Sequence, residues 1–141
     1  MESNATPAEP RPFHIEVPDA VLDDLDARLA MTAFAADMVN DDWRYGLPTS
    51  YLEELVAYWR GGYDWRQQEQ TMNRLPQFRV ELDGVPIHFV HVRGRGPSPV
   101  PLVLSHGWPW TFWDFAKIIE PLTRPEDFGG DPDDSFDVVV P

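Results

Sequence analysis

The sequence predicts a protein of the α/β class, in which a helical meander precedes the first strands of a sheet. Two observations support this class. In the first half of the chain, apolar residues recur every three or four positions, as they do in amphipathic helices. After Pro76 the apolar period becomes two, as it is in strands. The change divides the 141 residues into a flexible tail at 1–12, a helical region at 13–76 and the incomplete start of a sheet region at 77–141.

The helical region opens with an apolar alternation at 13–17, which predicts a short strand. Pro18-Asp19 follows and predicts the start of a helix with Asp19 near its N-cap. This helix is amphipathic, because acidic residues and Arg28 alternate with apolar residues at helical spacing. Its apolar face consists of Val21, Leu22, Leu25 and Leu29.

Two further helices are predicted before the period changes. Ser50 and Glu53 stand at capping-box spacing and predict a helix start, and Gly61-Gly62 predicts its end. A third helix is predicted over 64–73 with Asp64 as its cap. The second helix is expected to bury a stripe of Leu52, Leu55, Val56 and Trp59.

The sheet region begins with a predicted hairpin. Residues 78–82 alternate, Asp83-Gly84 is a strong signal for a two-residue turn, and 85–92 continues as the second strand. The run at 101–105 is continuously apolar, which predicts a strand buried on both faces.

A helix over 111–122 and a buried strand over 136–140 complete the predicted elements. Thr111 and Asp114 are placed to cap that helix. Because an apolar strand ends the sequence, we expect an unfinished sheet with exposed pairing groups. We therefore expect the chain to be the front portion of a larger protein, either a gene fragment or a truncation.

Composition excludes several classes of function. The chain has 24 acidic and 11 basic residues, a net charge of −13, which disfavours nucleic acids and anionic membrane surfaces as partners. It has no cysteine, so disulfides, thiolate nucleophiles and cysteine-based zinc sites are excluded. No apolar run has the length of a membrane span, and we expect a soluble, cytoplasmic protein.

One motif at a strand–helix junction points to chemistry. His106-Gly107-Trp108-Pro109 follows the apolar run, at the end of a strand where open α/β sheets bind ligands. Gly107 is expected to allow a sharp bend, and Pro109 fixes one dihedral angle and removes one donor. Such a rigid loop can direct the Trp108 backbone N–H at a developing oxyanion. The alternative is an ordinary tight turn with an aromatic plug, and His106 alone is expected to make only loop hydrogen bonds.

The motif resembles the oxyanion-hole motif of epoxide hydrolases of the α/β-hydrolase fold. Further stretches resemble the microsomal type of this family, including its N-terminal domain. They are 13–29, Trp43-Arg44-Tyr45-Gly46, 58–66, 73–78, Asp83-Gly84 with 87–92, Pro121-Leu122 and 129–132. Relatives usually place glycine directly after the motif's proline, whereas this chain has Trp110.

The resemblance implies hydrolysis of a small-molecule epoxide to a vicinal diol through an aspartyl ester, without metal or organic cofactor. It assigns Trp108 as an oxyanion-hole donor through its backbone N–H, with His106, Gly107 and Pro109 shaping the loop. The family's nucleophile, lid tyrosines and histidine–acid pair have no counterpart among these residues, so we expect the chain alone to be inactive.

Other interpretations stay open at this point. The chain could come from another α/β-hydrolase such as a dehalogenase or an esterase, although those relatives generally begin near the hairpin. It could also be an interaction or regulatory module without catalysis, or a non-functional truncated product. A homodimer, or association through an exposed sheet edge, is a further expectation.

Overall fold

A computed structural model describes residues 9–37, 39, 40 and 42–141; most of the predicted tail lies outside them. The chain forms two compact units. We call Glu16–Gln68 the helical unit, and the residues up to Ile15 together with Glu69–Pro141 the sheet unit. The division differs from the predicted regions, because 13–15 and 69–76 belong with the sheet.

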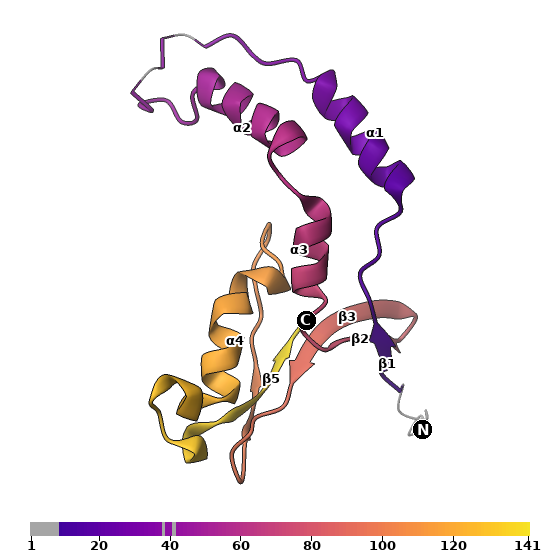
Figure 1. Ribbon diagram of the computed structural model, residues 1–141, viewed down its shortest axis with the longest axis vertical. Coiled ribbons are helices and arrows are strands. Elements are labelled where there is room, and N and C mark those ends of the chain that lie inside the picture. The colour runs from indigo at the N-terminus through magenta and orange to yellow at the C-terminus, as the bar shows by residue number, and fades with distance from the viewer. Residues whose placement is uncertain (1–8, 38, 41) are drawn as a thin grey trace. The chain divides into compact units, whose positions relative to one another are not determined.

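The helical unit is built on two long helices and the start of a third, and Figure 1 shows them in indigo to magenta. The first and third predicted helices lie close to their expected bounds. The second begins one residue before its expected start. The helices are α1 (Asp19–Ala30), α2 (Thr49–Gly61) and α3 (Trp65–Met72).

Prolines, not polar side chains, stand at the N-caps of the two long helices. Pro18 caps α1 and Pro48 caps α2, both with ψ of 142°, and neither cap makes a side-chain hydrogen bond. The predicted capping box of Ser50 and Glu53 is therefore wrong, whereas Asp19 lies directly after the cap of α1, as predicted. Each proline holds the extended conformation that a cap residue needs, so the helix begins directly after it. The cap of α3 is as predicted, because Asp64 accepts a hydrogen bond from the Gln67 N–H at 3.0 Å.

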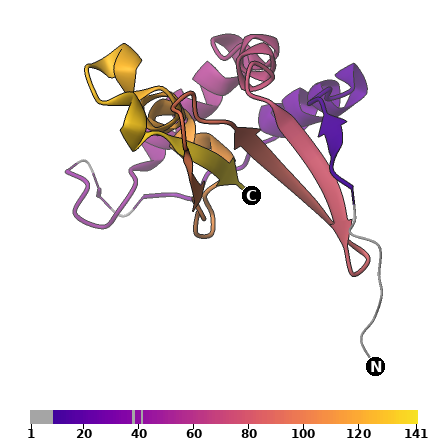
Figure 2. The same ribbon diagram turned by 90° about the horizontal axis from the view of Figure 1, so that it is seen from below.

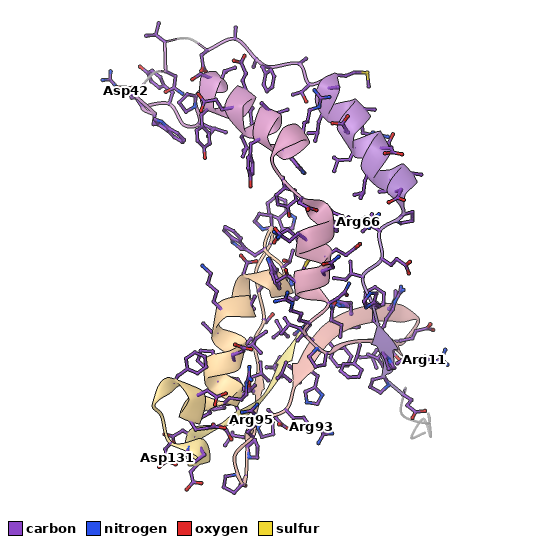
Figure 3. All side chains as sticks on the ribbon, in the orientation of Figure 1. Arg11, Asp42, Arg66, Arg93, Arg95 and Asp131 are labelled. Atoms are coloured by element: carbon purple, nitrogen blue, oxygen red, sulfur yellow. The ribbon has the colours of Figure 1, made fainter. Side chains whose placement is uncertain are left out.

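The apolar faces of α1 and α2 are not buried. Neither helix contains a buried residue, and Leu55 and Trp59 of the expected stripe are 42% and 45% exposed. The predicted burial is wrong because helical spacing shows which residues share a face, not whether another element covers that face. Ion pairs contribute to the unit instead: Asp26 and Arg60 join α1 to α2 at 2.8 Å, and Arg66, labelled in Figure 3, pairs with Asp19.

The sheet unit contains one five-stranded sheet in the order β1-β2-β3-β5-β4. The first four strands in this order pair antiparallel, and β4 pairs parallel with β5. The predicted α/β architecture, an opening hairpin followed by strand, helix and strand, is present. The strands are β1 (Arg11–Phe13), β2 (Gln77–Leu82), β3 (Val85–Val92), β4 (Val100–Val103) and β5 (Phe136–Val140).

The β2–β3 hairpin is as predicted. Asp83 and Gly84 form its turn with positive φ angles of 51° and 79°, the conformation that a two-residue hairpin turn requires. The predicted strand at 13–17 is displaced, because β1 occupies Arg11–Phe13 beside β2. The side-chain amide of Asn73 accepts from the Ile15 N–H at 2.9 Å and donates to the Ile15 carbonyl at 2.8 Å. These bonds occupy the backbone groups that a longer strand would use.

The hydrophobic core lies between the sheet and the helix α4 (Ala116–Thr123), which Figures 1 and 2 show beside β5. Ile119 of α4 packs on Val90, Val138 and Val140, and all four side chains are fully buried. The last strand is therefore interior, between β3 and β4.

The sheet has two edge strands among the described residues, β1 and β4. The second of them, β4, differs from the prediction made for it. This strand was expected to be buried on both faces, but its only neighbour among the described strands is β5, and Val103 is 64% exposed. The prediction fails because a continuous apolar run reports hydrophobicity, and not which elements cover the two faces of the strand.

Candidate functional site

The predicted motif lies on the loop that joins β4 to α4. Residues 104–111 leave the carboxyl end of β4 and enter a 3₁₀ turn, η1 (Phe112–Phe115), which continues into α4. The Leu104 N–H donates to the Val139 carbonyl at 2.9 Å and ties the start of the loop to the interior strand β5. The loop thus starts from a fixed point at the end of the sheet, where this class of fold binds ligands.

The centre of the loop is a tight turn. The Trp110 N–H donates to the Gly107 carbonyl at 2.8 Å, and the Trp108–Pro109 peptide bond within the turn is cis. The His106 ring donates from Nδ1 to the same carbonyl at 3.3 Å. Two donors thus converge on the Gly107 oxygen, and the four motif residues form one structured turn.

A capping box holds the far side of the loop, as the sequence predicts. The Thr111 hydroxyl accepts from the Trp113 N–H at 3.2 Å, and the Asp114 carboxylate accepts from the Thr111 N–H at 2.8 Å. These two bonds fix the point at which the chain enters η1. The turn is therefore held at both ends, at Leu104 by the sheet and at Thr111 by the cap.

Within the described part of the chain, the Trp108 backbone N–H is a free donor of this loop, as are the three N–H groups at 105–107 before it. Among the residues that the structure describes, none accepts a hydrogen bond from it, whereas the Trp110 and Thr111 N–H groups both have acceptors. The Trp108 side chain is 95% exposed, so it does not serve as a plug in a packed turn. An unpaired backbone N–H in a structured turn is a group that can stabilise an anion.

Gly107 was expected to allow the sharp bend of the loop, and this prediction is wrong. Its φ lies outside the left-handed region, and a Cβ at this position would meet no described atom within 4 Å. The bend is made at Trp108 and Pro109, one and two residues later. Gly107 leaves open space beside the Trp108 N–H and does not supply conformational freedom.

A polar network that the sequence did not predict joins the end of α3 to β2 and β3. The buried Gln77 amide donates to the Met72 carbonyl at 2.9 Å and accepts from the His88 ring at 2.9 Å. Burial, reinforced by the positive charge of Arg79, lowers the pKa of His88. Both rings next to His88, those of Phe13 and Phe112, contact it edge-on at 5.1 Å. This environment favours a neutral, structural histidine.

The histidines do not assemble a metal site. Ring contacts place His88 against Phe112 and His91 against Phe78, as expected for residues three apart on a strand, which lie on opposite faces. Across 9–37, 39, 40 and 42–141, no group of three histidine, aspartate or glutamate side chains could hold a metal ion. Within the same residues, no helix has the length and apolar character to cross a membrane.

Comparisons with known proteins agree with this geometry. Residues 10–115 match the family model "Epoxide hydrolase N terminus". An epoxide hydrolase homologue of Stigmatella aurantiaca is 44% identical over 130 residues, which cover 92% of this chain and 30% of that protein. Epoxide hydrolase 1 of Oryctolagus cuniculus is 36% identical over 135 residues, with 93% and 30% covered.

A solved structure shows the same fold. The epoxide hydrolase of Aspergillus niger superposes with a TM-score of 0.81 at 31% identity, covering 94% of this chain and 34% of the other. The chain thus spans about 30% of the length of the curated relatives it matches. The family match covers the helical region and the motif loop together, which the dehalogenase and esterase alternatives do not explain. The chain belongs to the epoxide hydrolase family, in the region that the N-terminal model of that family describes.

Proposed function

We propose that this chain contributes the Trp108 backbone N–H to the oxyanion hole of an enzyme that hydrolyses small-molecule epoxides to diols. In that reaction an aspartate opens the epoxide, and water then attacks the resulting ester through a tetrahedral oxyanion. In the α/β-hydrolase fold one donor comes from the residue after the nucleophile and the other from the loop after the third strand of that fold. Counted from the β2–β3 hairpin, β4 is the third strand, and the loop at 104–111 follows it. This loop therefore supplies the second donor.

The observation that carries the proposal is that, among the described residues, the Trp108 N–H is unbonded within a turn whose following amides are bonded. The Trp110 and Thr111 N–H groups are bonded within the chain, while that of Trp108 is not, among the described residues. A preorganised donor is useful only if the fold does not satisfy it internally, because a bonded N–H would have to break that bond to stabilise the oxyanion. The turn and the capping box supply that preorganisation.

The first test is the activity of the purified chain. Incubated with styrene oxide, the 141-residue chain is expected to form no diol above the buffer rate, because the nucleophile and the base of the reaction are not supplied by it. Diol formation above that rate would contradict this assignment.

The second test removes the donor. The chain is co-expressed with the part of the Stigmatella aurantiaca relative that it does not cover, and the assembled pair is assayed for diol formation. Trp108→Pro deletes the N–H and is expected to lower kcat about 10²–10³-fold. Trp108→Phe keeps the N–H and serves as the matched control, with activity close to that of the unchanged chain. Equal activity of the two variants would overturn the role of the backbone donor.

Association through the sheet edge and a cytoplasmic location stay predictions. The exposed edge strand β4 supports the first. Val100 and Leu104 donate to β5, so the intervening Pro101 and Val103 face away from it. The Val103 N–H is therefore a donor at this edge, and Val103→Pro is expected to reduce any concentration-dependent association in sedimentation. Association that is unchanged in this variant would exclude the β4 edge.

A further inference from the structure

The loop at 104–111 is joined to the sheet by a side-chain contact that the proposed function does not use. Phe112, the first residue of η1, directly follows the loop. Its ring contacts the His88 ring of β3 edge-on, with 5.1 Å between the ring centroids and 62° between the ring planes. Phe112 also packs against the hydrophobic core. The ring pair thus links β3 to the point at which the loop enters η1.

The capping box alone does not fix the loop relative to the sheet. Its bonds join Thr111 to Trp113 and Asp114, so all of its members lie within one short stretch of chain. Such a box sets the backbone conformation of the helix entrance but leaves open where that entrance lies. The packing of Phe112 on its neighbours determines that position. Position matters for catalysis, because a displacement of about 1 Å can cost about 10²-fold in rate.

Two further groups hold the His88 ring in place. The Gln77 side-chain oxygen accepts from the ring Nε2 at 2.9 Å, and the Phe13 ring of β1 contacts the imidazole edge-on at 5.1 Å. The Gln77 amide nitrogen donates to the Met72 carbonyl, so the amide oxygen faces His88 and Nε2 is the nitrogen that bears the proton. A ring with one hydrogen bond and two aromatic neighbours has little freedom to rotate.

The Gln77 amide is itself anchored within the sheet unit. Gln77 is 4% exposed, and its amide nitrogen also lies 3.3 Å from the Asn73 side-chain oxygen, to which it donates. Asn73 in turn bonds both backbone groups of Ile15. The orientation of the His88 ring is therefore set by bonds that reach the ends of α3 and β1, and none of these bonds involves the loop at 104–111.

We propose that His88 is a positioning residue for the loop at 104–111. Gln77 holds the imidazole, and the imidazole holds Phe112, which places the turn around Trp108. His88 acts through Phe112 and does not touch the reacting atoms. This role rests on the proposed function, because the place of the turn matters for catalysis only if the Trp108 N–H belongs to an oxyanion hole. The first test below needs no activity, so the two proposals can fail separately.

The first test compares amide hydrogen exchange in the full 141-residue chain and in two variants. His88→Gln can keep a hydrogen bond but removes the ring, whereas His88→Phe keeps a ring against Phe112 but removes the bond. The Trp110 N–H bond closes the turn, and the Leu104 amide, bonded to the Val139 carbonyl of the sheet, is the reference. We expect exchange of Trp110 relative to Leu104 to rise about tenfold in His88→Gln and to change less than about threefold in His88→Phe.

His91→Gln is the matched control for this comparison. His91 lies on the same strand, but its ring contacts Phe78 on the opposite face of the sheet. We expect the exchange ratio of Trp110 to Leu104 to stay at its original value in this variant. A ratio that does not rise in His88→Gln, or that rises as much in His91→Gln, would overturn the proposal.

The second test separates positioning from a loss of folded protein. Each variant is assembled with the part of the Stigmatella aurantiaca relative that the chain does not cover, and the pair is mixed rapidly with styrene oxide. Hydrolysis of the ester needs the oxyanion hole, whereas opening of the epoxide by the aspartate does not. His88→Gln is therefore expected to consume as much epoxide in the first turnover as the unchanged pair, and to release diol about 10–100-fold more slowly. His88→Phe is expected to restore the rate of release.

Two kinetic results would contradict the role of His88. A smaller first-turnover amplitude with an unchanged rate of diol release per active site would show that His88 supports folding only. Slow release in His88→Phe as well as in His88→Gln would show that the ring does not place the loop. Failure of the proposed function is recognised separately, because Trp108→Pro and Trp108→Phe would then be equally active, while the exchange ratio still reports on His88.

Discussion

The two units of this chain are stabilised by different interactions. The sheet unit buries four aliphatic side chains completely between α4 and the paired strands β3 and β5. The helical unit has two longer helices but buries no residue of either, and exposed ion pairs contribute to joining them. Buried apolar area contributes far more free energy than exposed ion pairs do. The sheet unit is therefore the stable scaffold of the loop at 104–111. The apolar side chains of α1 and α2 in the helical unit stay partly exposed.

Truncation of the core tests this comparison with the largest expected effect. Ile119→Ala removes a fully buried side chain and is expected to lower the free energy of unfolding by about 2–5 kcal/mol, because it leaves a cavity. Leu55→Ala in the helical unit is the matched truncation of a side chain that is 42% exposed, and less than about 1.5 kcal/mol is expected. Urea unfolding followed by circular dichroism measures both. Equal losses would break the comparison.

Each unit also contains one buried side-chain amide, and these provide the next contrast. Gln77→Leu leaves the His88 ring without its partner and removes one of the two donors to the Met72 carbonyl, which keeps the Leu75 N–H, at a cost of about 1–3 kcal/mol to the sheet unit. Asn40 bonds only locally, accepting from the Tyr45 N–H and donating to the Gly46 carbonyl. Asn40→Ala is therefore expected to raise hydrogen exchange around 45–46 and leave that of β2 and β3 unchanged. Faster exchange in β2 after Asn40→Ala would contradict the separation of the units.

A pH dependence is expected in the sheet unit. Burial lowers the pKa of His88 in the folded state, so the unfolded chain, with a histidine pKa of about 6.5, binds the proton more readily. The stability that this group contributes is present above that pH and is lost as the pH falls through it. The urea midpoint of β-sheet unfolding is expected to decrease from pH 8 to about 5.5, and the decrease is smaller in His88→Gln. A midpoint that rises on acidification would contradict the assigned direction.

The smallest effect is expected from the ion pair between α1 and α2. A hydrogen bond from Arg60 lowers the pKa of Asp26, but both groups are exposed to solvent. Asp26→Asn is therefore expected to change stability by an amount close to the error of a urea titration, and salt removes even this difference. A loss as large as that of Ile119→Ala would show that ion pairs, not apolar burial, hold the chain together.

The sequence predicted the helices, strands and turns well, but it predicted the burial of these elements poorly. Asp83-Gly84 and the Thr111–Asp114 box determine their own backbone conformation, so their structures follow from neighbouring residues. The burial of α2 and β4 depends on which elements lie beside them, and an apolar pattern does not contain that information. The displaced β1 has the same cause, because Asn73 lies some sixty positions away from Ile15.

In the candidate site, too, local features were predicted from the sequence and the hydrogen-bond partners of the loop were not. The motif located the loop, and its far cap was predicted from Thr111 and Asp114. The sequence did not show which amides of the loop stay free, because the partners of Trp108 and Trp110 depend on the path of the turn. The stripe of Leu55 and Trp59 was interpreted as buried core, although both residues are partly exposed.

The most direct test of the central claim is hydrogen exchange at two neighbouring amides of the intact chain, followed by nuclear magnetic resonance. The Trp110 N–H, bonded to the Gly107 carbonyl at 2.8 Å, serves as the internal reference. We predict that the Trp108 amide exchanges at close to the rate of an unstructured peptide while the Trp110 amide is protected. Protection of Trp108 equal to that of Trp110 would show that the fold already uses this donor and would contradict its role in an oxyanion hole.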